Sequence, residues 1–374
     1  MSGLPAVLVL EDGRAFEGVG FGAAGTAFGE VVFNTAMSGY EETLTDPSYR
    51  GQIVAMTASH VGNYGITGDD AESDRIQVSG FAARHFPERF SNARGKKGLG
   101  ETLREAGIVS IHGIDTRALV RHLRSLGAMR GAVSTEHVDE AGRARLLARV
   151  LEQPPMTGAP LALEVGTRAP YAWGSHAAGR PRVAALDYGI KRNILRHLAF
   201  RGLDVTVFPA TTTPSELAGF DGFFLSNGPG DPAALPAQAE TIRALVGTGK
   251  PVFGICLGHQ LLGLALGART FKLKFGHRGV NHPVKDLATG AVSITSQNHG
   301  FAVDPASLPA GLEQTHVNLN DGTCEGFRLK GRPVFAVQYH PESAPGPHDS
   351  DPLFAEFARQ LVPAAMAEQV PSTG

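Results

Sequence analysis

A cysteine between two glycines is the residue of this sequence that could most plainly act as a nucleophile. Cys256 lies in Gly254-Ile255-Cys256-Leu257-Gly258, between a β-branched apolar run and a helical run. This strand–turn–helix setting is typical of a nucleophile elbow, with Cys in the place of Ser in the G-x-S-x-G pattern. A helix N-terminus there would favour a thiolate and offer backbone N–H groups to an oxyanion. The alternative is a small buried core residue, as free cysteines usually are.

A thiolate nucleophile needs a base, and one histidine stands out among the 14 in the chain. His340 lies in Tyr339-His340-Pro341-Glu342, at the end of a predicted strand. Residues two apart in an extended segment share a face, so His340 and Glu342 can lie together. A carboxylate that orients the imidazole would complete a Cys–His–acid arrangement. Taken singly, His340 reads as a satisfied histidine at a strand end and Glu342 as a solvated surface charge.

A glycine-rich loop is the third candidate element. Asn227-Gly228-Pro229-Gly230-Asp231-Pro232 follows a predicted strand at 223–226. The carboxyl ends of parallel strands line the active crevice, and glycine amides there can hold an oxyanion or a carboxylate. An ordinary turn of the same composition is the alternative.

The second half of the chain contains the elements that would position these residues. Strands alternate with helices of about ten residues, which favours a parallel sheet covered on both faces. Strands are predicted at 183–186, 204–208, 223–226, 252–255, 291–295, 312–318, 324–329 and 334–338. Helices are predicted at 190–200, 237–246, 257–266 and 353–361. We therefore expect an α/β domain over residues 182–365.

The first half predicts a different domain. Strand candidates lie at 7–10, 30–36 and 52–59, and amphipathic helices at 116–126 and 141–151, with Asp115 as an N-cap and Gly127 as a stop. We expect an α+β domain over residues 1–152. Residues 153–181 are rich in Pro, Gly and Ala and are predicted to form a linker. Residues 366–374 are predicted to be a disordered tail.

Composition excludes several classes of protein. The 374 residues are 42% hydrophobic and 19% charged, with a formal net charge of −2. These values fit packed cores and argue against nucleic acid or a membrane surface as a partner. The two cysteines, Cys256 and Cys324, exclude a disulfide scaffold and argue against a multi-cysteine zinc or iron–sulfur site. With no predicted signal peptide or membrane span, we expect a cytoplasmic protein.

The ordered set of motifs resembles the class I, or triad, glutamine amidotransferase family. The runs that carry the resemblance are Asn227–Pro232, Gly254–Gln260 and Tyr339–Glu342. The resemblance implies that Cys256 attacks the side-chain amide of glutamine, that His340 is the base and proton donor, and that Glu342 orients it. It also implies a glutamyl thioester, release of ammonia, and an oxyanion hole formed by the amides of Leu257 and Gly230.

The resemblance extends to the N-terminal half, which is similar to the small-subunit family of carbamoyl phosphate synthetase. The matching runs include Gly29–Thr35, Met37–Glu42, Thr45–Tyr49, Gly113–Arg117, Leu186–Asn193, Gly279–Val284 and Ser296–Phe301. In this family ammonia passes to a large subunit that uses ATP, Mg and bicarbonate. The resemblance therefore implies a heterodimer in arginine or pyrimidine biosynthesis, leaves a higher oligomer of heterodimers open, and implies no cofactor or metal on this chain.

The same resemblance assigns the glutamine contacts. They carry over to Ser48, Gly228, Gly230, Leu257, Gln260, Asn298, Gly300 and Phe301. Gln260 lies one turn beyond Cys256 on the same helix face and would hold the α-amino or carboxylate end of the substrate. Ser48, from the first domain, and the backbone amides near Gly300 would bind the α-carboxylate. Cys324 has no base motif nearby and is expected to be buried and inert.

Three other functions are weighed against this one. A glutaminase that feeds anthranilate or nucleotide synthesis would have the same triad, but the N-terminal half argues against it. A cysteine peptidase on the same scaffold differs through Gln260 and the loop at 227–231. A regulatory subunit with an inactive site is disfavoured because Cys256, His340 and Glu342 are all present.

Overall fold

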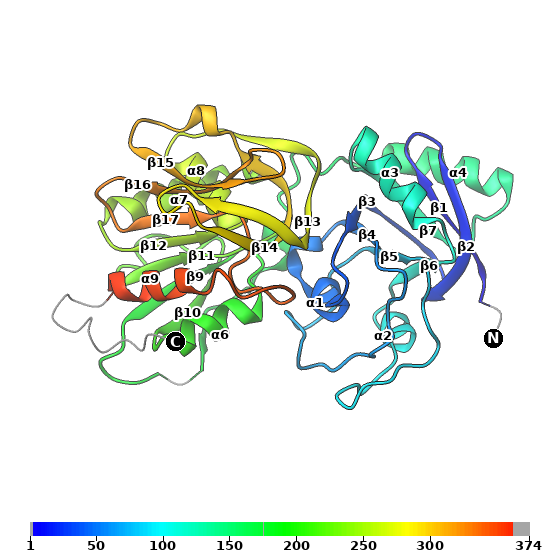
Figure 1. The fold of residues 1–374 in the computed structure, drawn as a ribbon, viewed down its shortest axis with the longest axis horizontal. Helices are drawn as coiled ribbons and strands as arrows, with labels where there is room; N and C mark the ends of the chain where they lie inside the picture. The colour runs from blue at the N-terminus through cyan, green and yellow to red at the C-terminus, as the bar shows by residue number, and fades with distance from the viewer. Residues whose placement is uncertain (1–2, 175, 362–374) are drawn as a thin grey trace. The chain divides into compact units, whose positions relative to one another are not determined.

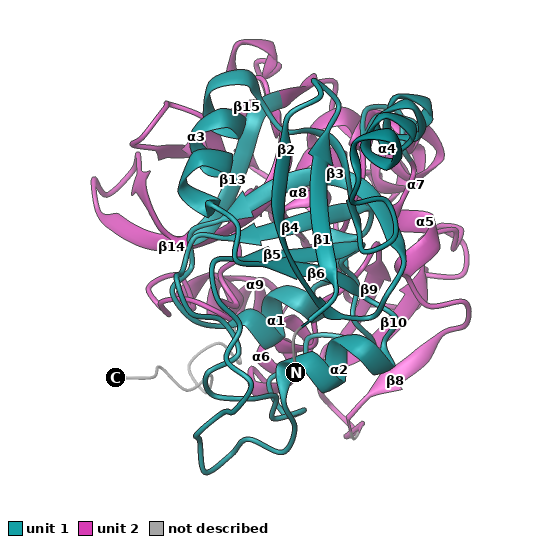
Figure 2. Cartoon of the chain, turned by 90° about the vertical axis from the view of Figure 1, so that its right-hand side faces the viewer, with its two compact units in different colours: residues 1–159, 273–279 teal, residues 160–272, 280–374 magenta. Residues whose placement is uncertain are grey.

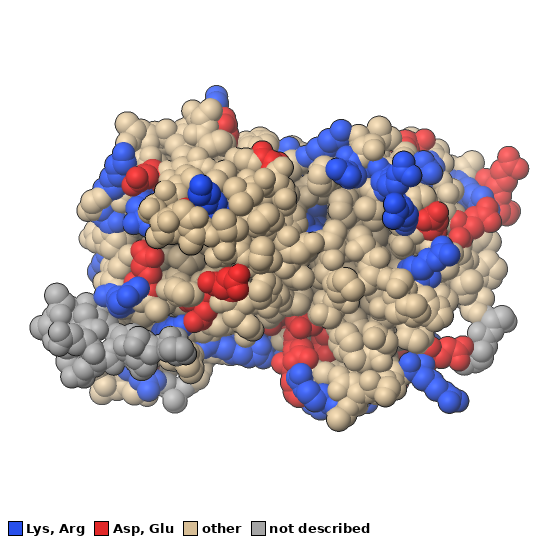
Figure 3. Space-filling model, viewed as in Figure 1, with Lys and Arg blue, Asp and Glu red and all other residues tan. Residues whose placement is uncertain are grey.

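We describe the chain from a computed structural model, which places residues 3–174 and 176–361. The chain divides into two compact units (Figure 2). Unit 1 contains Met1–Ala159 and Leu273–Gly279, and unit 2 contains Pro160–Lys272 and Val280–Gly374. No helix in the described part of the chain is long and apolar enough to cross a membrane. On the face that Figure 3 shows, side chains of both charge signs are interspersed over each unit.

Unit 1 is built on a closed barrel of seven strands in the order β1-β2-β6-β5-β4-β3-β7. The run β3-β4-β5-β6 is parallel and the remaining pairs are antiparallel. Closure leaves no open sheet edge in the barrel. The strands are β1 (Pro5–Leu10), β2 (Ala15–Gly22), β3 (Thr26–Asn34), β4 (Gln52–Met56), β5 (Gly80–Ala83), β6 (Val109–His112) and β7 (Met129–Ser134).

Successive side chains of a strand point to opposite faces, so the barrel strands carry apolar side chains on both faces. Helices pack against the barrel and help to bury these side chains. Leu8 and Leu10 of β1 join the apolar cluster that contains α3, whereas Val7 and Val9 join the cluster that contains α4. The helix α3 begins where predicted, since the Asp115 carboxylate accepts from the Ala118 amide at 2.9 Å. The helices are α1 (Tyr40–Thr45), α2 (Leu99–Glu105), α3 (Thr116–Leu126) and α4 (Glu140–Glu152), with a 3₁₀ turn at Pro47–Tyr49.

A segment far along the chain completes unit 1. Residues Leu273–Gly279 lie next to the N-terminal strands, where the ring of Phe275 stacks on Phe33 with centroids 5.8 Å apart. The Ala128 amide donates to the Lys274 carbonyl at 2.8 Å, and the Thr35 amide donates to the Arg278 carbonyl at 3.1 Å. Unit 1 is therefore not continuous in sequence.

Unit 2 is built on a ten-stranded sheet in the order β14-β13-β15-β16-β17-β12-β11-β9-β10-β8. Its central run β17-β12-β11-β9-β10 is parallel, as the alternation of strands and helices predicts. The first strands are β8 (Tyr171–Trp173), β9 (Arg182–Asp187), β10 (Asp204–Pro209), β11 (Gly222–Leu225) and β12 (Val252–Ile255). The others are β13 (Thr270–Asp286), β14 (Val292–Val303), β15 (Leu312–Asn318), β16 (Cys324–Leu329) and β17 (Val334–Val337).

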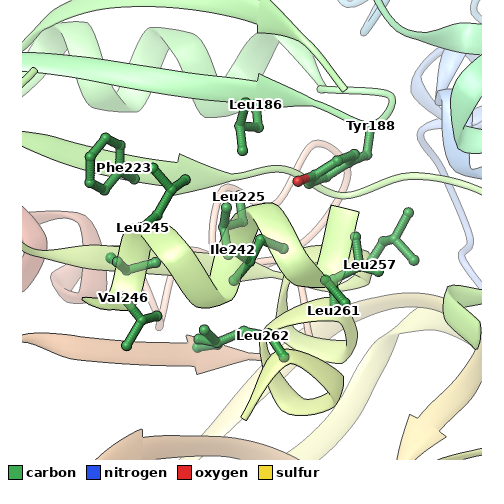
Figure 4. Close-up of a cluster of buried hydrophobic side chains, with 14 of the residues drawn as sticks. Leu186, Tyr188, Phe223, Leu225, Ile242, Leu245, Val246, Leu257, Leu261 and Leu262 are labelled. Carbon is green, nitrogen blue, oxygen red and sulfur yellow. The ribbon is translucent and has the colours of Figure 1, made fainter. Parts of the chain in front are cut away.

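Both faces of the parallel run are covered (Figure 1). Ala184 and Leu186 of β9 point into a core with α7 and α8, part of which Figure 4 shows. Val183 and Ala185 point the other way, into a core with α6 and α9. The helices are α5 (Ala162–Val165), α6 (Arg192–Phe200), α7 (Pro236–Gly247), α8 (Leu257–Ala265) and α9 (Pro352–Leu361), with 3₁₀ turns at Pro232–Ala234 and Pro305–Ser307.

The structure differs from the sequence expectation in several places. The predicted linker 153–181 contains α5, and also β8, which pairs antiparallel with β10. The strand β8 has only three residues, which is too short for an alternating pattern to be recognised in a Pro- and Gly-rich run. Four strands of the barrel, β2, β5, β6 and β7, were not predicted either, and neither were the helices α1 and α2 or the long strand β13 of unit 2. The predicted tail 366–374 lies outside the described residues.

Candidate active site

The nucleophile elbow forms where β12 passes into α8. Cys256 lies between the two elements with φ 55° and ψ −104°, a strained conformation for a residue with a side chain. The turn requires glycine on both sides. A Cβ at Gly258 would lie 2.2 Å from the Leu225 carbonyl oxygen, and one at Gly254 would lie 2.9 Å from the Gly258 backbone. The sequence therefore predicts this turn correctly, and for a steric reason.

The backbone around Cys256 is held on both sides. Its amide donates to the Val337 carbonyl at 2.9 Å, and the Gly258 amide donates to the Ser226 carbonyl at 2.9 Å. Leu257 is the first residue of α8, so its N–H has no acceptor within its own helix. That amide is available to an oxyanion formed next to the sulfur. The Cys256 Sγ lies 3.6 Å from the Asn298 carbonyl oxygen.

His340 and Glu342 lie together just beyond β17. The His340 Nδ1 is 2.7 Å from Glu342 Oε1, and both side chains are buried. The carboxylate accepts from Nδ1–H, which leaves Nε2 as the nitrogen that can exchange a proton with a reacting group. This Nε2 is buried and has no hydrogen-bond partner among the described residues. The His340 amide donates to the Ser296 carbonyl at 2.9 Å, so strand β14 runs beside the histidine.

A buried lysine is the functional residue that sequence reasoning missed. The Nζ of Lys191 donates to Glu342 Oε1 at 2.9 Å and to the Ser343 carbonyl at 2.8 Å. Asn193 donates from Nδ2 to the Glu342 carbonyl at 2.5 Å. Lys191 occupies the N-cap position of α6, in the segment that follows β9. A lysine just after the carboxyl end of a central strand is the sequence signal from which this role could have been predicted.

The charges of these groups support one another. Burial alone would lower the pKa of His340, but the Glu342 carboxylate and the neighbouring Cys256 raise it to about 10. Burial would raise the pKa of Glu342, but Lys191 and His340 lower it to about 2. The carboxylate is therefore charged and the imidazole holds its proton at neutral pH. A protonated His340 therefore places a positive charge beside Cys256.

The loop after β11 is packed against the segment that carries Lys191. The Tyr188 amide donates to Ser226 Oγ at 2.9 Å, and the Lys191 amide donates to Asn227 Oδ1 at 3.2 Å. A Cβ at Gly228 would lie 2.1 Å from the Tyr188 carbonyl oxygen and 3.0 Å from Leu257 Cδ2. Glycine is thus required, and the loop lies next to the start of α8.

The predicted glutamine contacts on unit 2 gather around the nucleophile. Gln260 donates from Nε2 to the Phe301 carbonyl at 2.7 Å and to Gln338 Oε1 at 3.0 Å. Asn298 and Gly300 lie on the same strand β14, whose Asn298 carbonyl faces the Cys256 sulfur. Gly230, with φ 93°, lies in the loop after β11.

Ser48, the remaining predicted glutamine contact, belongs to unit 1. It lies in the 3₁₀ turn Pro47–Tyr49, where its amide donates to Asp46 Oδ1 at 2.9 Å. The side chain is 7% exposed. Its assignment as a glutamine contact stays a prediction.

The other titratable groups near the sheet are poor candidates for chemistry. Burial raises the pKa of the Cys324 thiol to about 12, so this cysteine is a thiol at neutral pH. His259 is fully buried against the Phe327 ring, and burial lowers its pKa to about 3. That this chain binds no metal stays a prediction, which rests on the family resemblance.

The arrangement can carry out acyl transfer from an amide. Cys256 supplies the nucleophile and the proton-holding imidazole of His340 supplies the acid. Glu342 and Lys191 hold the imidazole in place, and the first amide of α8 can bind the oxyanion.

Comparison with known proteins covers both halves of the chain. A family profile described as glutamine amidotransferase class-I matches residues 184–360. A second, described as carbamoyl-phosphate synthase small chain, CPSase domain, matches residues 8–133. The chain is 54% identical to the carbamoyl phosphate synthase small chain of Solidesulfovibrio magneticus, over 96% of this chain and 98% of that one.

Two further relatives agree over similar lengths. Identity is 53% with the carbamoyl phosphate synthase small chain of Chlorobaculum tepidum, over 96% of this chain and 99% of the relative. Identity is 52% with the carbamoyl phosphate synthase small chain of a Nostoc species, over 96% of this chain and 95% of the relative. With a class I amidotransferase half, a small-chain half and relatives of this identity over nearly its whole length, the chain belongs to the carbamoyl phosphate synthase small-chain family.

Proposed function

We propose that this chain is the glutamine-hydrolysing subunit of carbamoyl phosphate synthase. The observation that carries the proposal is the buried Cys256–His340–Glu342 arrangement, with 2.7 Å between His340 Nδ1 and Glu342 Oε1, in a chain of this family. The site lies in the half of the chain that matches the class I glutamine amidotransferases. The reaction is hydrolysis of the glutamine side-chain amide to glutamate and ammonia.

The geometry supports a thioester mechanism. The Cys256 thiolate attacks the amide carbon, and the oxyanion is bound by the amides of Leu257 and Gly230. His340 transfers its Nε2 proton to the leaving nitrogen, so the C–N bond breaks and ammonia departs from a glutamyl thioester. His340 then takes a proton from water as the water attacks the thioester. The products are glutamate and the regenerated thiolate–imidazolium pair.

The ammonia is used elsewhere. We propose that a large subunit takes it up and makes carbamoyl phosphate from bicarbonate, and that ATP and Mg bind to that subunit and not to this chain. The closed barrel of unit 1 contains no residue of the Cys256–His340–Glu342 triad, which supports a role for unit 1 in docking. Two free, buried cysteines fit work in a reducing cytoplasm.

One substitution tests the proposal. Cys256→Ser, assayed as the complex with the large subunit, should abolish carbamoyl phosphate synthesis from glutamine and retain synthesis from ammonium. Serine lacks the thiolate but keeps the shape of the elbow, so assembly should persist. Rates are compared with glutamine and with ammonium at saturating concentrations.

The matched control is the second cysteine. Cys324→Ser should leave both rates near those of the unmodified protein, because the Cys324 thiol is buried beside the Gly326 carbonyl, 3.6 Å away. Retained glutamine-dependent synthesis in Cys256→Ser would refute the assignment of the nucleophile. A comparable loss in Cys324→Ser would mean that the wrong cysteine was chosen.

A further inference from the structure

A buried carboxylate on β16 takes no part in the mechanism above. The Glu325 side chain is 0% exposed. Its Oε2 accepts from Gln297 Nε2 at 3.0 Å, and its Oε1 accepts from Asn318 Nδ2 at 2.8 Å. Burying a carboxylate costs free energy unless it is hydrogen-bonded. The two amide donors reduce that cost, and the burial of Glu325 itself calls for a structural or functional reason.

The carboxylate fixes the orientation of the Gln297 amide. A carboxylate only accepts, so the Gln297 group that faces Glu325 must be the NH2. The same Nε2 lies 3.1 Å from Thr295 Oγ1. The amide oxygen therefore points the other way, and Gln297 Oε1 lies 2.9 Å from His299 Nε2. His299 Nε2 therefore faces an oxygen acceptor.

The second nitrogen of His299 also faces an acceptor. His299 Nδ1 lies 2.8 Å from the Phe301 carbonyl oxygen. Both ring nitrogens thus face an oxygen acceptor. The contacts Glu325–Gln297–His299–Phe301 form one hydrogen-bonded relay, and the Glu325 carboxylate also lies close to His299 and His277, with one ligand atom of each within 4.8 Å of the others.

The relay ends on a residue that the family resemblance assigns to glutamine. The Phe301 carbonyl that accepts from His299 also accepts from Gln260 Nε2 at 2.7 Å, and Gln260 Nε2 donates again to Gln338 Oε1 at 3.0 Å. Both amide hydrogens of Gln260 are used in these two bonds. The Gln260 Oε1 is then the end of the side chain that can accept from the ammonium group of an amino-acid substrate.

We propose that Glu325 is a positioning residue for glutamine binding. It holds Gln297 and His299, and through the Phe301 carbonyl it holds Gln260 with its oxygen facing the substrate. Glu325 itself touches neither glutamine nor the Cys256 sulfur. The inference rests on the proposed function, because it concerns binding of the same substrate at the same site.

The test is Glu325→Leu in the complex with the large subunit. We expect the KM for glutamine to rise about tenfold or more, which is the size of effect typical of losing a hydrogen bond to a charged group. The kcat at saturating glutamine and the rate with ammonium should change less than about twofold, since the triad is intact. Glu325→Gln retains one acceptor oxygen and the side-chain shape, so it should restore most of the lost affinity.

Asn318→Leu is the matched control. It removes the other amide donor of the same carboxylate but leaves the path through Gln297 and His299. We expect a lower melting temperature with an unchanged KM for glutamine. A KM rise in Asn318→Leu equal to that in Glu325→Leu would overturn the proposal in favour of a purely structural role.

A double-mutant cycle keeps the proposal falsifiable if one variant folds poorly. Gln297→Leu interrupts the same relay one residue nearer the site and should raise the KM on its own. If the two residues act through one chain, the pair Glu325→Leu with Gln297→Leu should raise the KM no more than the larger single effect. Multiplied effects, or an unchanged KM in both single variants, would refute the relay.

Failure of the inference is distinguishable from failure of the proposed function. If Cys256→Ser abolishes glutamine-dependent synthesis while Glu325→Leu keeps its KM, only the relay is wrong. If Cys256→Ser retains glutamine-dependent synthesis, the proposed function itself is wrong, whatever Glu325→Leu does.

Discussion

Two cationic groups meet on one carboxylate oxygen in the active site. Glu342 Oε1 accepts from His340 Nδ1 at 2.7 Å and from Lys191 Nζ at 2.9 Å, and all three side chains are buried. A buried carboxylate with one cationic partner balances charge, whereas two partners leave a net positive site. That excess positive charge lies beside Cys256, where a negatively charged sulfur or oxyanion would form during the reaction.

Replacement of Lys191 should change the charge balance around Glu342. In Lys191→Met the pKa of Glu342 should rise, because the cation that lowers it most is gone. Loss of one partner of a buried ion pair costs about 3–5 kcal/mol of stability. We expect a lower melting temperature and at least a tenfold fall in glutamine-dependent kcat.

The control for this substitution is a lysine of the same unit outside the site. Lys250 donates to the Ala218 carbonyl at 3.0 Å and is partly exposed. Lys250→Met should leave the glutamine-dependent kcat unchanged. An equal loss of activity in both variants would contradict a specific role for Lys191.

The proton on His340 gives a second prediction at the residue scale. Its pKa is raised from the ordinary 6.5 to about 10, so the pair with Glu342 stabilises the fold fully below pH 6.5 and less as the pH approaches 10. In Glu342→Gln the carboxylate that raises this pKa is gone, and burial lowers it. His340 should then lose its proton at a lower pH, which histidine NMR titration can follow.

A consequence for the thiol accompanies this shift. Alkylation of Cys256 by iodoacetamide at neutral pH should be slower in Glu342→Gln, because a neutral imidazole stabilises the thiolate less. An unchanged alkylation rate would mean that His340 is not the group that holds the thiolate. Cys324 is buried and remains protonated, so it should react slowly in both proteins.

At the scale of elements, the elbow depends on contact between β11, β12 and the first turn of α8. Gly258 packs against the Leu225 backbone, and the strained Cys256 residue is held by hydrogen bonds on either side. The strain is tolerated because the surrounding backbone determines the turn.

Gly258→Ala should therefore damage the element and not only the chemistry. A methyl group 2.2 Å from the Leu225 carbonyl oxygen must push α8 away from β11. We expect a loss of stability of about 1–3 kcal/mol, as overpacking typically costs, together with loss of glutamine-dependent activity. The measurements are thermal unfolding and the rate with glutamine.

Gly247→Ala is the control, because a Cβ at the end of α7 meets nothing within 4 Å. It should leave activity unchanged and stability equal or slightly higher, since alanine favours the helix. If Gly258→Ala behaved like Gly247→Ala, the close approach of α8 to β11 would be wrong.

At the scale of the whole chain, unit 1 includes a segment that lies more than a hundred positions after residue 159, where its N-terminal part ends. Leu273–Gly279 supplies the Phe275 ring to Phe33 and two backbone partners to the barrel region. A gene fragment that ends at residue 159 lacks this segment. The apolar surface of Phe33 would then be open to water.

A fragment of residues 1–159 should accordingly bind a peptide of residues 270–282 and gain stability. Ligand binding to the folded state raises its melting temperature in a concentration-dependent way. The matched control is the same peptide with Phe275→Ala, which should raise the melting temperature less. Equal effects of the two peptides, or none, would contradict the assignment of this segment to unit 1.

The sequence alone determined the local chemistry of this protein. The glycines around Cys256 and the spacing of His340 and Glu342 encode torsion angles and shared faces, which act over a few residues. The same local signals gave the bounds of β12 and β16, and the start and end of α3. The family resemblance added the substrate.

Only the tertiary structure decided which distant groups meet. Lys191 and Glu342 are 151 positions apart, and Gln297 and Glu325 are 28 apart. The closure of the barrel and the strand β8 inside the expected linker were equally invisible in the pattern. Strand order and register set these contacts, and they follow from packing of the whole chain, which a local period of apolar residues does not encode.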